Sequence, residues 1–236
     1  MPRFFQVLSP NVDVHTLEGL PLIGLRPCRL SRSSQLLKRT ADLVVSTVAL
    51  VLLAPLFAAL AVAIKIDSPG PVFFRQLRMG RAERTFRIYK FRTMVRDADA
   101  LKSRLAHLNV HRGPGGDPRM FKIADDPRVT RAGNLLRRYS LDELPQLINV
   151  LKGEMSLVGP RPLILDEDHH VRHWARRRTS CLPGITGPWQ VLGRSTIPFE
   201  EMISLDYLYV TEWSFFGDFK WIARTVPALF RVRDAY

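Results

Sequence analysis

One long apolar segment, from Leu43 to Ile64, limits what this chain can fold into. Its 22 residues include no ionisable side chain. At about 1.5 Å per residue, a helix of this length covers the roughly 30 Å hydrocarbon core of a bilayer. The segment begins too late in the chain, and has the wrong flanks, for a secretory signal peptide. We therefore predict a membrane helix over residues 38–66.

The residues leave two routes open for this helix. Pro55 lies near the middle of the apolar run, where it removes a backbone hydrogen bond and bends a helix. Both flanks have the basic composition of cytoplasmic segments, which favours a re-entrant helix that enters and leaves by the same face. A kinked helix that spans the bilayer is the alternative. The flanking cations are Arg29, Arg32, Lys38 and Arg39 before the segment, and Lys65, Arg75, Arg78 and Arg81 after it.

The chain as a whole is basic, which points to an anionic partner. Its 236 residues include 35 Lys and Arg against 22 Asp and Glu, a formal charge of +13. Nucleic acid, an anionic membrane surface and phosphorylated small molecules all fit this charge. A hydrophobic content of 46% excludes a chain that is disordered throughout. The two cysteines, Cys28 and Cys181, exclude a disulfide framework and suit a reducing compartment.

Local patterns predict the elements around the membrane helix. Ser31 and Ser33 are candidate N-caps for it. Apolar and polar side chains alternate in places over residues 71–92, which predicts a small β-hairpin. Glycines and prolines over residues 113–118 predict a loop. Helical spacing predicts helices over residues 96–107 and 130–139. The buried face of a further helix would carry Leu144, Leu147, Ile148 and Leu151.

Asp142 and Glu143 are adjacent carboxylates at a predicted helix start, and two interpretations are open. Ser140 with Glu143 matches a capping box, while Asp142 as N-cap would put Pro145 in the first turn. Either capping arrangement explains both acidic residues without a catalytic role. Alternatively, a helix N-terminus beside Arg137 is an anion site, where an aspartate can attack phosphorus and form an acyl phosphate. A glycosidase pair is disfavoured, because neighbouring side chains on a helix diverge by about 100°.

Several short motifs occur in a fixed order along the chain. They are KFRTM at 90–94, DPRVT at 126–130, SLDELPQL at 140–147, NVLKG at 149–153, GPRP at 159–162 and PGITG at 183–187, followed by WQV at 189–191. In this order they resemble the bacterial sugar transferases called monotopic phosphoglycosyl transferases. The resemblance is collinear from about Lys38 to the C-terminus.

The resemblance implies a fold of the α+β class, mainly helical. A small cytosolic catalytic domain, residues 67–236, would sit on a re-entrant membrane helix bent at Pro55, with amphipathic helices at the interface. Residues 1–37 would be the end of a preceding regulatory domain. The enzyme would act at the cytoplasmic face of the bacterial inner membrane, transferring a sugar 1-phosphate from a UDP-sugar to undecaprenyl phosphate with Mg²⁺. This would be the first membrane step in making a surface glycan.

The resemblance also implies roles for individual residues. Asp142 would be the nucleophile and Glu143 its partner, and both would hold Mg²⁺. Arg161, between two prolines, is on a segment too stiff for an ordinary solvated loop, and its guanidinium suits a phosphate or a uracil carbonyl. The residues expected to bind substrate phosphates are Lys90, Arg137, Arg161, Gln190 and Arg194. Expected partners are the UDP-sugar, undecaprenyl phosphate and membrane lipids, without nucleic acid; association with a second copy is left open.

A competing hypothesis is a membrane-anchored basic protein that binds anionic lipid or nucleic acid without catalysis. His169, His170 and His173 imitate a metal cluster, but their spacing favours surface histidines. The stretch from Phe219 to Asp234 is amphipathic, and Pro227 predicts two short helical pieces. We expect this stretch to lie along the membrane interface. Packing of its apolar face on the domain core is the alternative.

Overall fold

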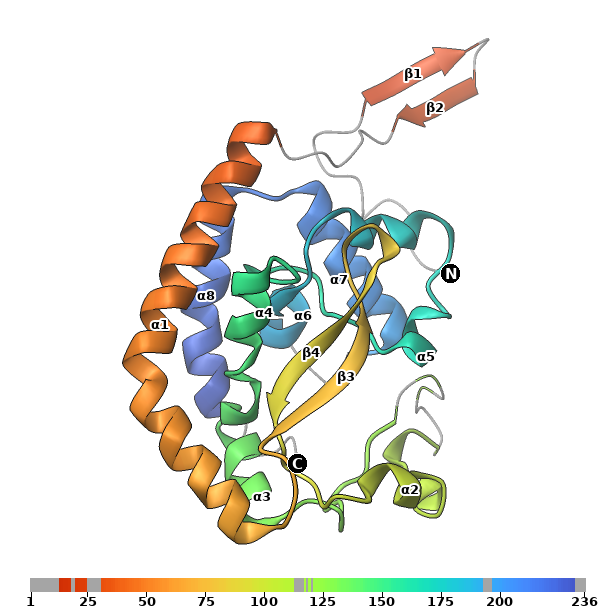
Figure 1. Ribbon diagram of the computed structural model, residues 1–236. Coiled ribbons are helices and arrows are strands. Elements are labelled where there is room, and N and C mark those ends of the chain that lie inside the picture. Colours follow the sequence, from red (N-terminus) through yellow and green to blue (C-terminus); the bar gives the residue numbers. More distant parts are fainter. Residues whose placement is uncertain are drawn as a thin grey trace.

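The computed structural model describes residues 13–17, 20–24, 31–112, 117, 119, 121–192 and 197–231 (Figure 1). Near the N-terminus, β1 (Asp13–Leu17) and β2 (Leu20–Gly24) pair in an antiparallel hairpin. Most of the loop predicted over residues 113–118 lies outside the described residues. The origin of residues 1–37 in a regulatory domain stays a prediction.

The predicted membrane segment belongs to one helix, α1 (Arg32–Asp67), of 36 residues. Ser31 is its N-cap, as predicted, and its Oγ accepts a hydrogen bond from the Ser34 backbone N–H at 3.1 Å. By length and composition α1 could cross a membrane, and only 11% of its most apolar stretch is buried. A core helix of a water-soluble protein would instead hide that surface. Pro55 lies inside α1, and Figure 1 shows the helix changing direction along its length.

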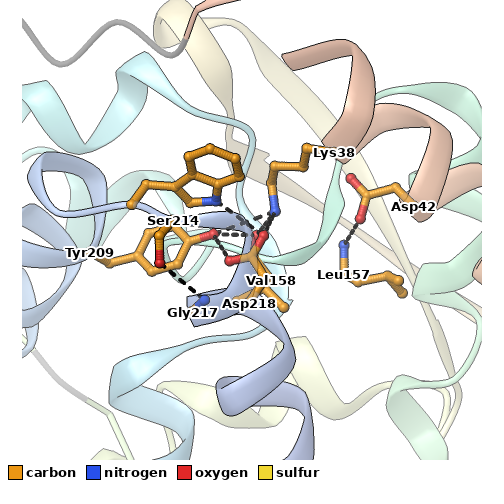
Figure 2. A network of polar contacts seen from close by, with 9 residues as sticks. Lys38, Asp42, Leu157, Val158, Tyr209, Ser214, Gly217 and Asp218 are labelled. Atoms are coloured by element: carbon orange, nitrogen blue, oxygen red, sulfur yellow. Dashed lines mark hydrogen bonds and ion pairs between the residues drawn. The ribbon is translucent and has the colours of Figure 1, made fainter. Parts of the chain in front are cut away.

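The first turns of α1 join the body through a buried polar cluster centred on Asp218 (Figure 2). The Lys38 ammonium donates to one Asp218 carboxylate oxygen at 2.5 Å and to the Val158 carbonyl at 3.0 Å. Tyr209 donates to the other carboxylate oxygen at 2.8 Å, and the Trp213 indole donates to the first at 3.0 Å. The cluster ties α1 to α8 (Phe215–Arg231) and α7 (Phe199–Thr211).

Two neighbouring residues of α1 reach other parts of the body. Arg39 donates to the last carbonyls of α4 (Gln146–Lys152), at 2.6 Å to Val150 and 3.0 Å to Leu151. It thereby satisfies carbonyls that a helix end leaves without partners. The Asp42 carboxylate accepts the Leu157 backbone N–H at 3.0 Å, within strand β5 (Ser156–Val158).

The other end of α1 packs on the same body through apolar side chains. Ile64 is 2% exposed and lies in a cluster with Phe91 and Leu136, against which Phe57 also packs. Beyond it, the Asp67 carboxylate accepts the Ala132 backbone N–H at 3.0 Å, at the start of α3 (Arg131–Arg138). Both ends of α1 therefore contact one folded unit.

The predicted hairpin is confirmed as β3 (Phe73–Met79) paired antiparallel with β4 (Thr85–Phe91). Phe86 and Ile88 point into a core cluster with Val150 and Met155. The helix predicted over 130–139 is confirmed as α3, with Thr130 as its N-cap. The helix predicted over 96–107 is too long, since α2 covers only Ala98–Lys102 and the chain then turns, with His107 bonded locally to the Arg104 carbonyl.

The buried face of α4 differs from the prediction. Leu147 is buried as expected, whereas Leu144, Ile148 and Leu151 are only partly buried. Val150 and Asn149 are fully buried in their place. The reason is that α4 packs on both α1 and β4, and the Asn149 amide binds β4, accepting from the Tyr89 N–H at 2.9 Å and donating to the Arg87 carbonyl at 2.8 Å.

The remaining elements close the body around two small parallel strands. β5 pairs in parallel with β6 (Gly184–Thr186), and the core between η6, α6 and α7 is built from apolar side chains such as Leu163, Trp189 and Phe199. The other elements are α5 (Leu165–Asp168), α6 (Pro188–Leu192), and the 3-10 segments η2 (Arg81–Glu83), η3 (Ala106–Leu108), η4 (Val110–Arg112), η5 (Leu141–Glu143) and η6 (His173–Ser180). The described fold is mainly helical with short strands, as predicted.

The C-terminal helix α8 corrects one prediction, whereas its position along the membrane interface stays a prediction. It continues through Pro227 rather than breaking into two pieces, because proline removes one N–H but keeps a helical φ. Its apolar face does not simply pack on the core: Phe216 is 82% exposed and Phe219 is 53% exposed. Trp221, by contrast, packs inward on the body. The ion pair between Lys38 and Asp218 joins the first turns of α8 to α1, and both helices carry exposed apolar residues.

Candidate active site

The two carboxylates Asp142 and Glu143 lie in η5, the turn between α3 and α4, and do not cap a helix. Ser140 adopts a left-handed backbone conformation with φ 53° and makes no capping hydrogen bond through its side chain. Pro145 is the N-cap of α4. Both capping interpretations are therefore wrong, because the chain reverses at Ser140 before α4 begins. Left-handed backbone is costly for a residue other than glycine, and such strain gathers at functional sites.

Asp142 is a buried carboxylate beside a lysine. It is 9% exposed, and its Oδ2 lies 3.9 Å from the Lys90 ammonium. The same ammonium donates to Glu143 Oε1 at 2.6 Å. Burial raises the pKa of Asp142 to about 6, and Glu143 adds to the rise, whereas Lys90 and Arg137 oppose it. The carboxylate is thus ionised at neutral pH but poorly solvated, as suits a nucleophile.

Lys90 reaches this turn because β4 is fixed against α4. The Asn149 amide bonds to the backbone of Arg87 and Tyr89, just before Lys90 on β4. Arg137, in the last turn of α3, donates from Nε to the Thr93 hydroxyl at 2.9 Å. The structure therefore places Lys90 beside both carboxylates, and Arg137 is close enough for its charge to act on Asp142.

A cleft opens at this point, and its lining includes four of the predicted site residues, Lys90, Glu143, Arg161 and Gln190, whereas Asp142 and Arg137 are not among the lining residues. Arg161 lies in it with its guanidinium carbon 4.3 Å from the Trp189 ring centroid. Its backbone is held by a buried pair, since Asp206 accepts its N–H at 3.4 Å and Arg178 donates to its carbonyl. The cleft is lined by Arg78, Ile88, Lys90, Glu143, Gln146, Arg161, Pro162, Gly184, Ile185 and Gln190.

Two of the lining residues, Arg78 and Gln146, were missed as site residues. Gln146 belongs to the acidic motif and follows it at the start of α4. From the sequence, Arg78 is only one of the cations that flank the apolar segment, although its spacing from Gln76 places both side chains on one face of a strand. The predicted residue Arg194 lies outside the described residues.

The carboxylates fit one mode of magnesium binding. Among the described residues no group of three His, Cys, Asp or Glu side chains is placed to hold a metal ion. Mg²⁺ commonly takes only one or two carboxylates, with waters and substrate phosphates completing its shell. Asp142 and Glu143 suit that arrangement. His169, His170 and His173 are exposed, as predicted for surface histidines.

The structure thus combines a basic body, one long and mostly exposed apolar helix, and a buried aspartate beside a cationic cleft. These features fit the class of membrane-associated proteins that bind phosphorylated compounds. The model of the family described as "Bacterial sugar transferase" matches residues 33–232. The chain belongs to this family.

Curated relatives agree with the match. The chain is 42% identical over 217 residues to "Galactosyl transferase CpsE" of Streptococcus agalactiae, covering 92% of this chain and 47% of the relative. It is 38% identical to "UDP-glucose:undecaprenyl-phosphate glucose-1-phosphate transferase" of Escherichia coli, covering 98% and 48%. It is also 38% identical to "Exopolysaccharide production protein ExoY" of Sinorhizobium fredii, covering 84% and 88%. The chain thus spans about half the length of the first two relatives and most of the third.

Proposed function

We propose that this protein is a phosphoglycosyl transferase that moves a sugar 1-phosphate from a UDP-sugar to undecaprenyl phosphate, at the start of surface glycan synthesis. The observation that carries the proposal is the buried Asp142 beside Glu143 and Lys90, two residues that line a cleft together with the further cations Arg78 and Arg161. The name of the Escherichia coli relative indicates the substrate class, a UDP-sugar and undecaprenyl phosphate. A purely structural acid would not require a cationic cleft that is open to solvent.

The geometry supports two displacement steps. Asp142 attacks the sugar-bearing phosphorus of the donor, forming an acyl phosphate while the bond to UMP breaks. An oxygen of undecaprenyl phosphate then attacks the same phosphorus, which releases Asp142 and yields the diphosphate-linked sugar lipid. Lys90 and Arg161 offset the negative charge that would otherwise keep two anions apart. Mg²⁺ held by Asp142 and Glu143 would supply further charge neutralisation at the donor phosphates.

A re-entrant path for α1 is part of the proposal. Lys38 and Arg39 near one end of α1, and Ile64 and Asp67 near the other, contact the same folded body. A helix that crossed a bilayer would place its ends on opposite sides of a hydrocarbon core about 30 Å thick. A single folded body that contacts both ends of the helix cannot lie on both sides of the bilayer. The exposed apolar surfaces of α1 and α8 would then enter one leaflet, with the body on the cytoplasmic face.

The activity is tested by UMP release from a panel of UDP-sugars, with undecaprenyl phosphate and Mg²⁺ present. We expect release with at least one sugar, and retention of radiolabelled sugar phosphate on the protein when the acceptor is omitted. Asp142→Asn should abolish both signals, whereas Asp166→Asn, at an exposed acid outside the cleft, should change neither. Absence of release across the panel would favour the competing hypothesis of a binding protein.

The path of α1 is tested by labelling single cysteines in intact cells. Ser33→Cys and Pro69→Cys lie at exposed positions beside the two ends of α1, in a background with Cys28 and Cys181 replaced by serine. We expect both to react only after the inner membrane is made permeable. Labelling of either one from the periplasm would show a spanning helix.

A further inference from the structure

Arg78 enters the cleft from β3, next to Arg161. Its two terminal nitrogens donate to neutral acceptors, the Pro162 carbonyl at 3.1 Å and the Gln76 side chain at 2.7 Å. Its Nε is buried and has no hydrogen-bond partner. Arg161 makes a cation–π contact with Trp189. Within the part of the chain that the structure describes, neither guanidinium has a carboxylate in hydrogen-bond contact.

This arrangement brings two positive charges together at a cost in free energy. Burial and the charge of Arg161 lower the pKa of Arg78 to about 10, although the charges of Glu167 and Glu143 partly oppose the fall, and Arg78 stays charged at neutral pH. A guanidinium has five N–H donors, and the hydrogen bonds of Arg78 to Pro162 and Gln76 engage two of its three nitrogens. Unpaired guanidinium groups in a polar cleft are suited to bidentate binding of phosphate oxygens.

A purely structural role does not account for the charge of Arg78. The hairpin is already joined to the segment after Pro162 by its backbone, because Arg78 bridges Ile164 and the Met79 N–H donates to the Leu163 carbonyl at 2.9 Å. A neutral amide could serve the two acceptors that Arg78 contacts. The cost of placing a second cation beside Arg161 therefore calls for an anion.

We propose that Arg78 and Arg161 together bind the diphosphate of the nucleotide-sugar donor. This inference rests on the proposed function and adds a donor-binding residue to it. The donor carries two linked phosphates and so matches two adjacent guanidinium groups, while Lys90 remains bonded to Glu143. The phosphate of the lipid acceptor has the same chemistry, and the test separates the two sources.

The test compares Arg78→Gln with Arg75→Gln in the full-length protein purified in detergent. Arg75 is a matched control on the same strand, since it is exposed and lies over the Tyr89 ring at 5.0 Å, outside the cleft. UDP affinity is measured by titration calorimetry, and KM is measured separately for donor and acceptor. We expect Arg78→Gln to weaken UDP binding and to raise the donor KM at least tenfold, the loss typical of a charge-assisted contact. The acceptor KM and all values for Arg75→Gln should stay within about twofold of wild type.

Two results would overturn the inference: UDP affinity within about twofold of wild type, or a rise confined to the acceptor KM. If Arg78→Gln melts well below wild type, Arg78→Lys replaces it, because it keeps the charge and loses the planar fork. That variant should still bind UDP at least threefold more weakly, and wild-type affinity would overturn the inference. A wild-type protein that binds UDP through Arg78 but releases no UMP would refute the proposed function and leave this site standing.

Discussion

Replacing Asp218 by Asn tests how α1 is held to the body (Figure 2). The side chains of Lys38 and Asp218 are 11% and 10% exposed, and their contact distance is 2.5 Å. In the variant, Lys38 keeps the Val158 carbonyl at 3.0 Å and the Tyr209 hydroxyl at 3.4 Å, but loses the negative charge. The perturbation therefore removes the bonded counter-charge of a buried cation and leaves only the nearby Asp42 carboxylate to offset it.

The expected loss of stability is about 3 kcal/mol. Removing one partner of a buried ion pair costs roughly 3–5 kcal/mol. The lower end applies here, because an asparagine oxygen can still accept from Tyr209 or Trp213 and two oxygens still solvate Lys38. For a chain of this size, about 3 kcal/mol lowers the melting temperature by roughly 6–12 °C.

The assay is thermal unfolding in detergent, followed by circular dichroism. Lys220→Gln, at an exposed position of α8, is the control and should melt within about 2 °C of wild type. The double variant Lys38→Met with Asp218→Asn should be no less stable than Asp218→Asn alone, because it removes the buried cation that has lost its bonded partner. The reasoning is refuted if Asp218→Asn melts with wild type, or if adding Lys38→Met lowers stability further.

Three other variants test the site and its support. Asp142→Asn, free of metal, should unfold at higher temperature than wild type at pH 7.5 but not below pH 4. In the folded wild type the pKa of Asp142 is about 6, above the ordinary value of 3.8. Ionisation of Asp142 therefore lowers the stability of the wild type as pH rises between these two values, by as much as about 3 kcal/mol. A lower melting temperature at pH 7.5 would contradict this. Asp206→Asn breaks the buried ion pair with Arg178, whose contact distance is 2.6 Å, and should destabilise the protein by about 3 kcal/mol. It should also raise the donor KM, because the pair holds the backbone of Arg161; an unchanged KM would show that the pair does not position Arg161 for the donor. Gly133→Ala should destabilise by more than about 2 kcal/mol in denaturant unfolding, because the new Cβ would lie 2.0 Å from the Thr93 carbonyl oxygen; wild-type stability would show that α3 shifts freely.

The sequence by itself determined the features that depend on neighbours along the chain. An uncharged run of membrane length predicts α1, and Ser31 begins that helix as its N-cap. Alternation predicts the β3–β4 hairpin, and Thr130 starts α3. The order of motifs identified the family and singled out the two carboxylates. These features were predictable because caps, periodicity and motif order act over a few residues.

Only the tertiary structure decided which residues from distant parts of the sequence meet at the cleft, and which contacts hold them there. Lys90 is 53 residues from Glu143, and it meets the carboxylates because Asn149 fixes β4 to α4. The left-handed turn at Ser140 overrode a plausible capping box. In the sequence Arg78 is one of the charges that flank the apolar segment, and only the packing of the hairpin against the segment around Arg161 places it in the cleft. Such placements come from the packing of surfaces far apart in the sequence, where burial and charge are set by residues that local patterns do not contain.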